Sequence, residues 1–436
     1  MWCCGSGGRG GRACGAVERA GRWRELHWIT MTNRRTFLTA AMAAPAVLRG
    51  ASTRSWAEIE KILASGNVKG RIAKDEVPTP ALMLDLDLFE ANVKKMVAHA
   101  KGHNRALRPH GKTHKCPEIA KYIVKQGALG ACAAKLSEAE VFAAHGVRGL
   151  LVTTAVVGKH KIERAVRLAG VAPDTIFCVD NAQNAQDLND AAGAAKRKLW
   201  VAIDLCVSGR TGIMPGAPAV ALGEQIAKLG NLKFKGIQAY AGGASHTKGW
   251  EKRKAASIAA MTPAIETRAE LNQRGVETPW LSGGSTGTYN IDSDIDGITE
   301  LQPGSFMFMD TDYNIIGGKE TGENYADFGN ALTIQATVVS RPTDAHVIID
   351  SGYKAMATDR PFVPLLKMAG VKFAFNGDEH AKVTSTEGAL KLQVGDRVEV
   401  IAPHCDPTVN LYDRIYCTRG GQVEAVWSIA ARGMAQ

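Results

Sequence analysis

The feature that most constrains this chain is an alternation, repeated eight times, of a short apolar run with an amphipathic helical segment. Helical segments such as residues 159–170 and 249–275 end at glycine, a common helix stop. Eight strand–helix alternations predict an α/β fold of the (β/α)8 barrel type, with a doubly wound open sheet as the structural alternative. The apolar runs lie near residues 105–110, 129–134, 149–154, 175–180, 199–205, 235–240, 279–283 and 299–307.

The residue pattern of the sequence changes near residue 330. From there, β-branched runs such as ALTIQATVVSRP and LQVGDRVEVIAP are separated by Gly, Pro and Asp turns. This pattern predicts a C-terminal antiparallel β-domain over residues 326–436, after a barrel over residues 79–325. We expect an N-terminal strand within residues 58–86 to complete the β-domain.

The first 57 residues read as a leader rather than as part of the fold. They hold nine arginines and two glutamates, and thus seven of the ten net positive charges. Residues 1–30 resemble an over-extended start, with Met31 as the initiator. Arg34-Arg35, followed by an Ala-rich apolar run, resembles a twin-arginine export signal, and Ser55-Trp56-Ala57 suits cleavage. The sequence therefore predicts periplasmic export; an accidental arginine pair on a cytoplasmic protein is the alternative.

Composition narrows the possible partners. Beyond the leader the chain is close to neutral, which argues against nucleic acid as a partner. No run of about 18 apolar residues occurs, so no membrane-spanning helix is expected. Six cysteines follow the leader without any CxxC pair, which predicts buried free thiols and no disulfide framework.

Basic residues crowd the end of the first predicted barrel strand, in RALRPHGKTHK. In such barrels, functional residues lie at the C-terminal strand ends, so Lys112 is placed as a reactive amine. We expect Arg108, and His110 if it is protonated, to lower the pKa of Lys112 and so favour Schiff-base formation. The ordinary alternative is a solvated run of surface charge.

A glycine-rich loop, SGGSTGT at residues 282–288, follows the seventh predicted strand. Glycines allow backbone N–H groups to approach an anion closely, and the Ser and Thr hydroxyls add donors. Barrels commonly bind phosphate in the loops after strands seven and eight. A lysine amine together with a phosphate-binding loop indicates pyridoxal 5′-phosphate.

Five motifs, in order, resemble those of the D-threonine aldolase family. They are RPHGKTHK at 108–115, QAY at 238–240 with His246, GGSTGT at 283–288, ELQPGSFMFMD at 300–310 and HCDPTVNLYD at 404–413. That family belongs to the alanine-racemase-type (fold type III) pyridoxal phosphate enzymes. The resemblance covers residues 79–433 and implies a barrel with a β-domain, usually as a homodimer.

The resemblance also implies roles for individual residues. Lys112 would bind the cofactor covalently and His246 would act as a base or support one. Arg210 and Tyr240 would lie beside the cofactor, and Asp378-Glu379-His380 would either line the site or form an exposed turn. The residues expected at its phosphate end are Gly283, Gly284, Ser285, Thr286 and Gly287.

His404-Cys405-Asp406 is the predicted metal motif. In extended backbone, residues two apart point to the same side, so His404 and Asp406 can share one ion. An imidazole and a carboxylate, completed by water and substrate oxygens, suit Mn²⁺ first, with Mg²⁺ or a similar ion as alternatives. The related D-serine dehydratases are expected to carry His-x-Cys, which favours zinc; Asp406 favours the aldolase branch.

The resemblance therefore implies a carbon–carbon lyase that cleaves D-threonine and other D-β-hydroxy-α-amino acids to glycine and an aldehyde. The D preference rests on the resemblance alone. Two alternatives remain open: a D-serine or 3-hydroxyaspartate dehydratase of the same fold, and a non-catalytic pyridoxal-phosphate-binding protein.

Overall fold

The computed structural model describes residues 54–360 and 363–436. The predicted initiator Met31 and the Arg34-Arg35 pair lie outside these residues. The described chain begins with α1 (Trp56–Ala64), whose start falls inside the leader predicted to end at residue 57. The Glu58 carboxylate accepts hydrogen bonds from the backbone N–H and the hydroxyl of Ser55, which fixes the first turn of α1.

All eight predicted barrel strands are present, and they form one parallel sheet. Its order is β2-β9-β8-β7-β6-β5-β4-β3. A parallel bridge between His110 and Cys132 joins the two outer strands, so the sheet closes on itself. This confirms the barrel and excludes the open sheet. The strands are β2 (Ala106–Leu107), β3 (Cys132–Ala133), β4 (Leu151–Val152), β5 (Ile176–Val179), β6 (Leu199–Leu205), β7 (Leu232–Ala239), β8 (Trp280–Gly283) and β9 (Glu300–Leu301).

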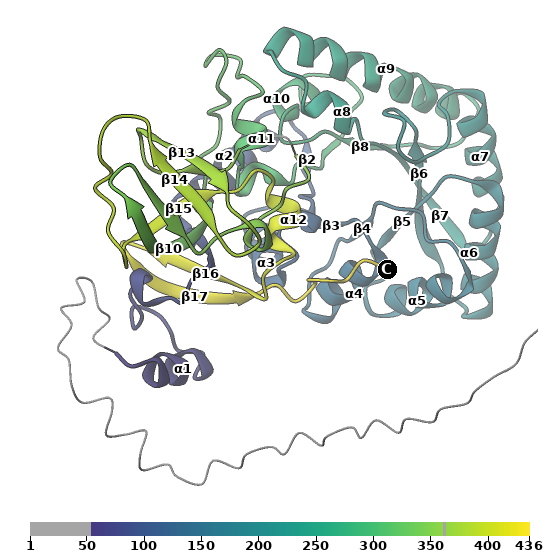
Figure 1. Cartoon of the computed structure of the whole chain (residues 1–436). Helices are drawn as coiled ribbons and strands as arrows, with labels where there is room; N and C mark the ends of the chain where they lie inside the picture. Colours follow the sequence, from purple (N-terminus) through teal and green to yellow (C-terminus); the bar gives the residue numbers. More distant parts are fainter. Residues whose placement is uncertain (1–53, 361–362) are drawn as a thin grey trace, which may run out of the picture. The chain divides into compact units, whose positions relative to one another are not determined.

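Helices cover the outside of the barrel sheet, as Figure 1 shows for α4 to α7. In α5, for example, most apolar residues are buried while Lys161, Glu163 and Arg167 are exposed, as its periodicity predicts. None of the described helices is long and apolar enough to cross a membrane. The helices of the barrel region are α2 (Leu86–Gly102), α3 (Pro117–Lys125), α4 (Leu136–Ala144), α5 (Lys159–Val171), α6 (Ala182–Ala194), α7 (Ala217–Ala227), α8 (Gly242–Ser245), α9 (Trp250–Gln273), α10 (Tyr289–Asp292) and α11 (Thr311–Asn314).

The second sheet has nine strands and includes the expected N-terminal strand. That strand, β1, pairs antiparallel with β10 and parallel with β16. The β-domain is therefore mixed, not purely antiparallel as predicted, because its N-terminal strand enters beside β16 in the same direction. The strands are β1 (Ala81–Asp85), β10 (Leu332–Thr343), β11 (His346–Ile349), β12 (Leu365–Leu366), β13 (Val371–Phe375), β14 (Ala381–Ser385), β15 (Arg397–Ile401), β16 (Arg414–Arg419) and β17 (Gln422–Ser428).

A buried ion pair inside the barrel holds β2 to β9. Arg108 donates two hydrogen bonds to Glu300, from Nε to Oε1 at 3.0 Å and from NH2 to Oε2 at 2.9 Å. Both side chains are almost completely buried. The pair fixes the end of β2, and the loop that follows β2 carries Lys112.

The six cysteines after the leader are free thiols, as predicted, and all except Cys206 are buried.

Candidate active site

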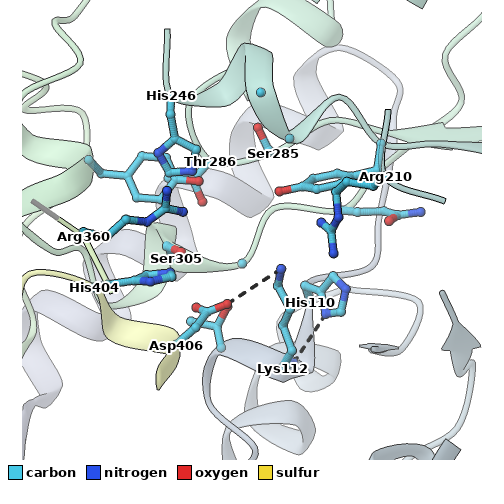
Figure 2. A pocket seen from close by; sticks show the side chains of 17 residues that line it. His110, Lys112, Arg210, His246, Ser285, Thr286, Ser305, Arg360, His404 and Asp406 are labelled. Carbon is cyan, nitrogen blue, oxygen red and sulfur yellow. Dashed lines mark hydrogen bonds and ion pairs between the residues drawn. The ribbon is translucent and has the colours of Figure 1, made fainter. Parts of the chain in front are cut away.

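One cavity of about 480 Å³ opens where the C-terminal ends of the barrel strands face the β-domain (Figure 2). Such a volume suits a small ligand or cofactor. Eight of the eleven residues predicted for the site line this cavity: Lys112, Arg210, Tyr240, His246, Ser285, Thr286, His404 and Asp406. The barrel supplies the first six and the β-domain the last two, so residues far apart in sequence converge as expected.

Lys112 lies in a single 3-10 turn, Gly111–Thr113, directly after β2. Its Nζ is 3.8 Å from Asp406 Oδ2 and 5.7 Å from the centre of the Tyr240 ring. Arg210 lies over the same ring, with its guanidinium carbon 5.8 Å from the ring centre. An amine, an aromatic ring and a guanidinium therefore meet at one wall of the cavity.

The expected lowering of the Lys112 pKa is wrong. Burial favours the neutral amine, but the Asp406 carboxylate and the Tyr240 phenol outweigh burial, so the pKa of Lys112 is raised. Arg108 does not lower this pKa as predicted, because Glu300 neutralises its charge inside the barrel. Burial also holds the pKa of His110 well below its usual value, so this ring is neutral.

The glycine-rich loop contributes two hydroxyls to the cavity, whereas its glycines allow its backbone to pack closely against neighbouring segments. Ser285 and Thr286 line the cavity, whereas Gly283, Gly284 and Gly287 do not. A Cβ at Gly283 would lie 2.3 Å from the carbonyl oxygen of Ala239, and one at Gly287 would lie 2.1 Å from that of Ser245. Gly284 has a φ of +77°. These glycines let the loop pack closely enough to present the two hydroxyls.

His246 follows α8, and its Nδ1 lies 3.2 Å from Oδ2 of the buried Asp312. Burial raises the pKa of Asp312, but His246 and Arg360 more than offset that effect, and the pKa lies below its usual value. Asp312 is therefore an anion that faces Nδ1. This arrangement favours a proton on Nδ1 and leaves Nε2 free as an acceptor.

His404 and Asp406 line the cavity together, but for a different reason from the one predicted. His404 is the extended residue before α12 (Cys405–Val409), so Asp406 lies in the first turn of a helix and not in a strand. Cys405 is completely buried and turned away from the cavity. His404 Nδ1 lies 2.8 Å from Asp359 Oδ2, which orients the imidazole.

The donor set at this wall fits a divalent ion in part. Within residues 54–360 and 363–436, no group of three or more His, Cys, Asp or Glu side chains is arranged to hold a metal. His404 and Asp406 offer one nitrogen and one carboxylate. Two such donors suit an ion that keeps several water or substrate oxygens, such as Mn²⁺ or Mg²⁺.

The donor set also fits a phosphorylated aldehyde cofactor. It offers a part-buried amine on Lys112 and hydroxyls on Ser285 and Thr286. Gly304 keeps the wall between them open, since a Cβ there would lie 2.5 Å from Thr113 Oγ1. That Thr113 hydroxyl is buried without a hydrogen-bond partner and borders the cavity, so it is available to a bound group.

Several cavity residues were not singled out from the sequence. Gln302, Gly304 and Ser305 belong to the quoted ELQPGSFMFMD motif, which was the available signal for them. Arg360 comes from a β-domain segment that shows no motif. Asp378-Glu379-His380 forms an exposed turn outside the cavity, which settles the two readings of that segment.

Comparison with protein families gives two matches. Residues 84–312 match the alanine racemase N-terminal domain, and residues 331–418 match a putative serine dehydratase domain. A 3-hydroxy-D-aspartate aldolase of Paracoccus denitrificans (strain Pd 1222) is 37% identical over 83% of this chain and 93% of its own length. A D-threonine aldolase of Arthrobacter sp. is also 37% identical, over 83% of this chain and 94% of its own length.

A dehydratase is more distant. The D-threo-3-hydroxyaspartate dehydratase of Delftia sp. (strain HT23) is 26% identical over 82% of this chain and 96% of its own length. Among solved structures, the D-threonine aldolase from Filomicrobium marinum superposes with a TM-score of 0.79 at 35% identity, covering 83% of this chain and 98% of that one. The chain thus belongs to the alanine-racemase-type enzyme family that contains the D-threonine and 3-hydroxy-D-aspartate aldolases.

Proposed function

We propose that this protein is a pyridoxal-phosphate- and divalent-metal-dependent aldolase. It cleaves D-threonine and other D-β-hydroxy-α-amino acids to glycine and an aldehyde. The observation that carries the proposal is the pairing of Lys112 with Asp406, Nζ to Oδ2 at 3.8 Å, in one cavity that His404 also lines. The names of the aldolase relatives support the reaction class.

Barrel residues hold the cofactor in this proposal. Lys112 supplies the amine for its covalent attachment, and the hydroxyls of Ser285 and Thr286 bind its phosphate. Arg210 and Tyr240, which contact each other at one wall of the cavity, would hold its ring. Pyridoxal phosphate, when bound, supplies an electron sink for the bond that breaks at the α-carbon.

His246 serves as the general base. Its Nε2 takes the proton from the β-hydroxyl of the substrate, and Nδ1 remains directed at Asp312. The anionic Asp312 stabilises the positive charge that the imidazole then acquires. Asp312 is a positioning residue because it acts through His246.

His404 and Asp406 hold the divalent ion, with Mn²⁺ as the preferred candidate. Such an ion, when bound, supplies Lewis-acid polarisation of the β-oxygen. Asp359 keeps the His404 ring in place through its contact with Nδ1. The buried Cys405 stays outside this ligand set, unlike the cysteine expected in the dehydratase branch.

Product analysis tests the reaction. The protein, loaded with pyridoxal phosphate and Mn²⁺, should convert D-threonine to glycine and acetaldehyde. Formation of 2-oxobutanoate instead would identify a dehydratase. Cofactor binding without any product from D-threonine or 3-hydroxy-D-aspartate would support a non-catalytic cofactor-binding protein.

Two treatments test the site. Lys112→Ala should abolish the visible absorbance band of the bound cofactor, whereas the exposed Lys161→Ala should retain it. Chelation with EDTA should remove activity, and added Mn²⁺ should restore it. Activity that survives both Lys112→Ala and chelation contradicts the assignment of Lys112, His404 and Asp406.

Periplasmic export through the Arg34-Arg35 signal and assembly as a homodimer complete the proposal. Fractionation of cells that carry the intact chain or an Arg34→Lys/Arg35→Lys variant tests export, since only the intact chain should reach the periplasm. Light scattering of the purified protein tests the dimer.

A further inference from the structure

We propose that Arg360 recognises a carboxylate on the β-carbon of the substrate. The preferred substrates are then D-β-hydroxy-α-amino acids with an acidic side chain, ahead of those with an alkyl side chain. This inference rests on the proposed function for the reaction, but the binding test below does not depend on turnover.

Arg360 reaches the cavity from the β-domain. In Figure 2 it enters from the left, facing Arg210 at the opposite wall. Its Nε lies 3.4 Å from Asp312 Oδ2 and 3.8 Å from Asp359 Oδ2. The cavity thus has an arginine at each side, and Arg360 is the one on the side of His246 and His404.

Within the described part of the chain, the guanidinium of Arg360 makes no hydrogen bond, although its buried Nε faces the Asp312 and Asp359 carboxylates at ion-pair distance. Structural arginines in this protein behave differently. Arg108 donates to both oxygens of Glu300, and Arg253 donates from all three nitrogens to backbone carbonyls. Arg360 is therefore placed for a ligand and does not serve as a brace.

The position of Arg360 determines which part of the substrate it can contact. Asp312 contacts both Arg360 and His246, and Asp359 contacts both Arg360 and His404. Arg360 thus lies between the proposed base and the proposed metal ligand, the two groups that handle the β-oxygen. The other substituent on the β-carbon lies beside that oxygen and therefore within reach of the guanidinium. A carboxylate is the substituent that matches the planar fork of an arginine.

Binding of two isosteric amino acids tests the proposal. D-Aspartate and D-asparagine have the same shape, but only D-aspartate carries a β-carboxylate, and neither has a β-hydroxyl to be cleaved. Calorimetry on the full-length protein loaded with pyridoxal phosphate and Mn²⁺ should show D-aspartate binding about tenfold to a hundredfold more tightly. Arg360→Gln should abolish this preference, and Arg360→Lys should retain part of it.

Kinetics provide a second readout. In Arg360→Gln, the ratio of kcat/KM for 3-hydroxy-D-aspartate to kcat/KM for D-threonine should fall by about tenfold to a hundredfold, since any effect through Asp312 is common to both substrates. Arg274→Gln is the matched control because it removes an exposed arginine at the end of α9, remote from the cavity.

Three results would overturn the proposal. The first is a wild-type protein that binds D-aspartate and D-asparagine equally. The second is an Arg360→Gln variant that weakens both ligands alike, which would assign Arg360 to the α-carboxylate. The third is an equal loss of activity on both substrates, which would make Arg360 a structural brace. Failure to release glycine from either substrate would refute the aldolase reaction and leave the binding comparison to decide the role of Arg360.

Discussion

Removing one partner of the Arg108–Glu300 pair should strongly destabilise the barrel. Glu300→Leu leaves the buried guanidinium without a counter-charge, while Arg108→Met leaves a buried carboxylate. Breaking such a pair costs about 3–5 kcal/mol because the remaining charge is out of reach of water. Each single variant should therefore lose about that much free energy of unfolding.

The double variant Arg108→Met/Glu300→Leu should lose far less than the sum of the two single variants. Replacing both partners with apolar side chains removes the uncompensated charge, and that exchange is often close to neutral. Some loss remains because Ser282 Oγ, which donates to Glu300 Oε1 at 2.8 Å, loses an acceptor. One hydrogen bond to a charged group is worth about 1.5–3 kcal/mol. We therefore expect the double variant to lie about 1–3 kcal/mol below the wild type.

Urea unfolding measures these differences. Tryptophan fluorescence and far-ultraviolet circular dichroism should give coincident transitions, which permits linear extrapolation to water. The coupling energy from the double-mutant cycle should be several kcal/mol. A single variant within about 1 kcal/mol of the wild type, or strictly additive losses, would refute the view that this pair holds β2 to β9.

Three further predictions follow from the site and its surroundings. Asp312→Asn should lower kcat about tenfold or more with an almost unchanged thermal midpoint, and steady-state kinetics with unaltered kcat would contradict its positioning role. Burial lowers the pKa of His114 to about 3. Below about pH 6.5, His114 therefore binds a proton in the unfolded chain but not in the folded one. The free energy of unfolding should then fall by about 1.4 kcal/mol per pH unit from pH 6.5 towards pH 3. In urea unfolding at several pH values, His114→Asn should show a slope of this free energy against pH that is smaller by that amount. Gly283→Ala should cost about 1–3 kcal/mol because its Cβ meets a β7 carbonyl, whereas Gly230→Ala, with open space around it, should cost less than about 0.5 kcal/mol in the same assay.

Much of the fold could be predicted because the apolar runs record the burial of each strand. Every run proposed as a barrel strand overlaps an observed strand, even where the strand is only two residues long, as in β3 and β4. The placement of Lys112 followed from one general rule, that strand ends carry the functional groups of a barrel. The parallel β1–β16 pair could not be foreseen, since sequence patterns do not reveal strand direction.

The charges and pKa values of the site residues were harder to predict from the sequence. Arg108 stands four positions before Lys112 in sequence, yet its charge is neutralised by Glu300 from the far end of the barrel region. Likewise, the neighbours that set the charge at Lys112 and His246, namely Asp406 and Asp312, arrive from distant segments. A pKa depends on contacts in space, and the sequence gives only contacts along the chain.

The central position of β1 in the second sheet has a consequence for biosynthesis. This strand leaves the ribosome long before either of its neighbours, β10 and β16, has been made. Until the last part of the chain emerges, its apolar residues Leu82 and Leu84 lack the sheet that buries them in the finished protein. Nascent chains halted before β16 should therefore be captured by chaperones that bind exposed apolar segments, whereas released full-length chains should escape them.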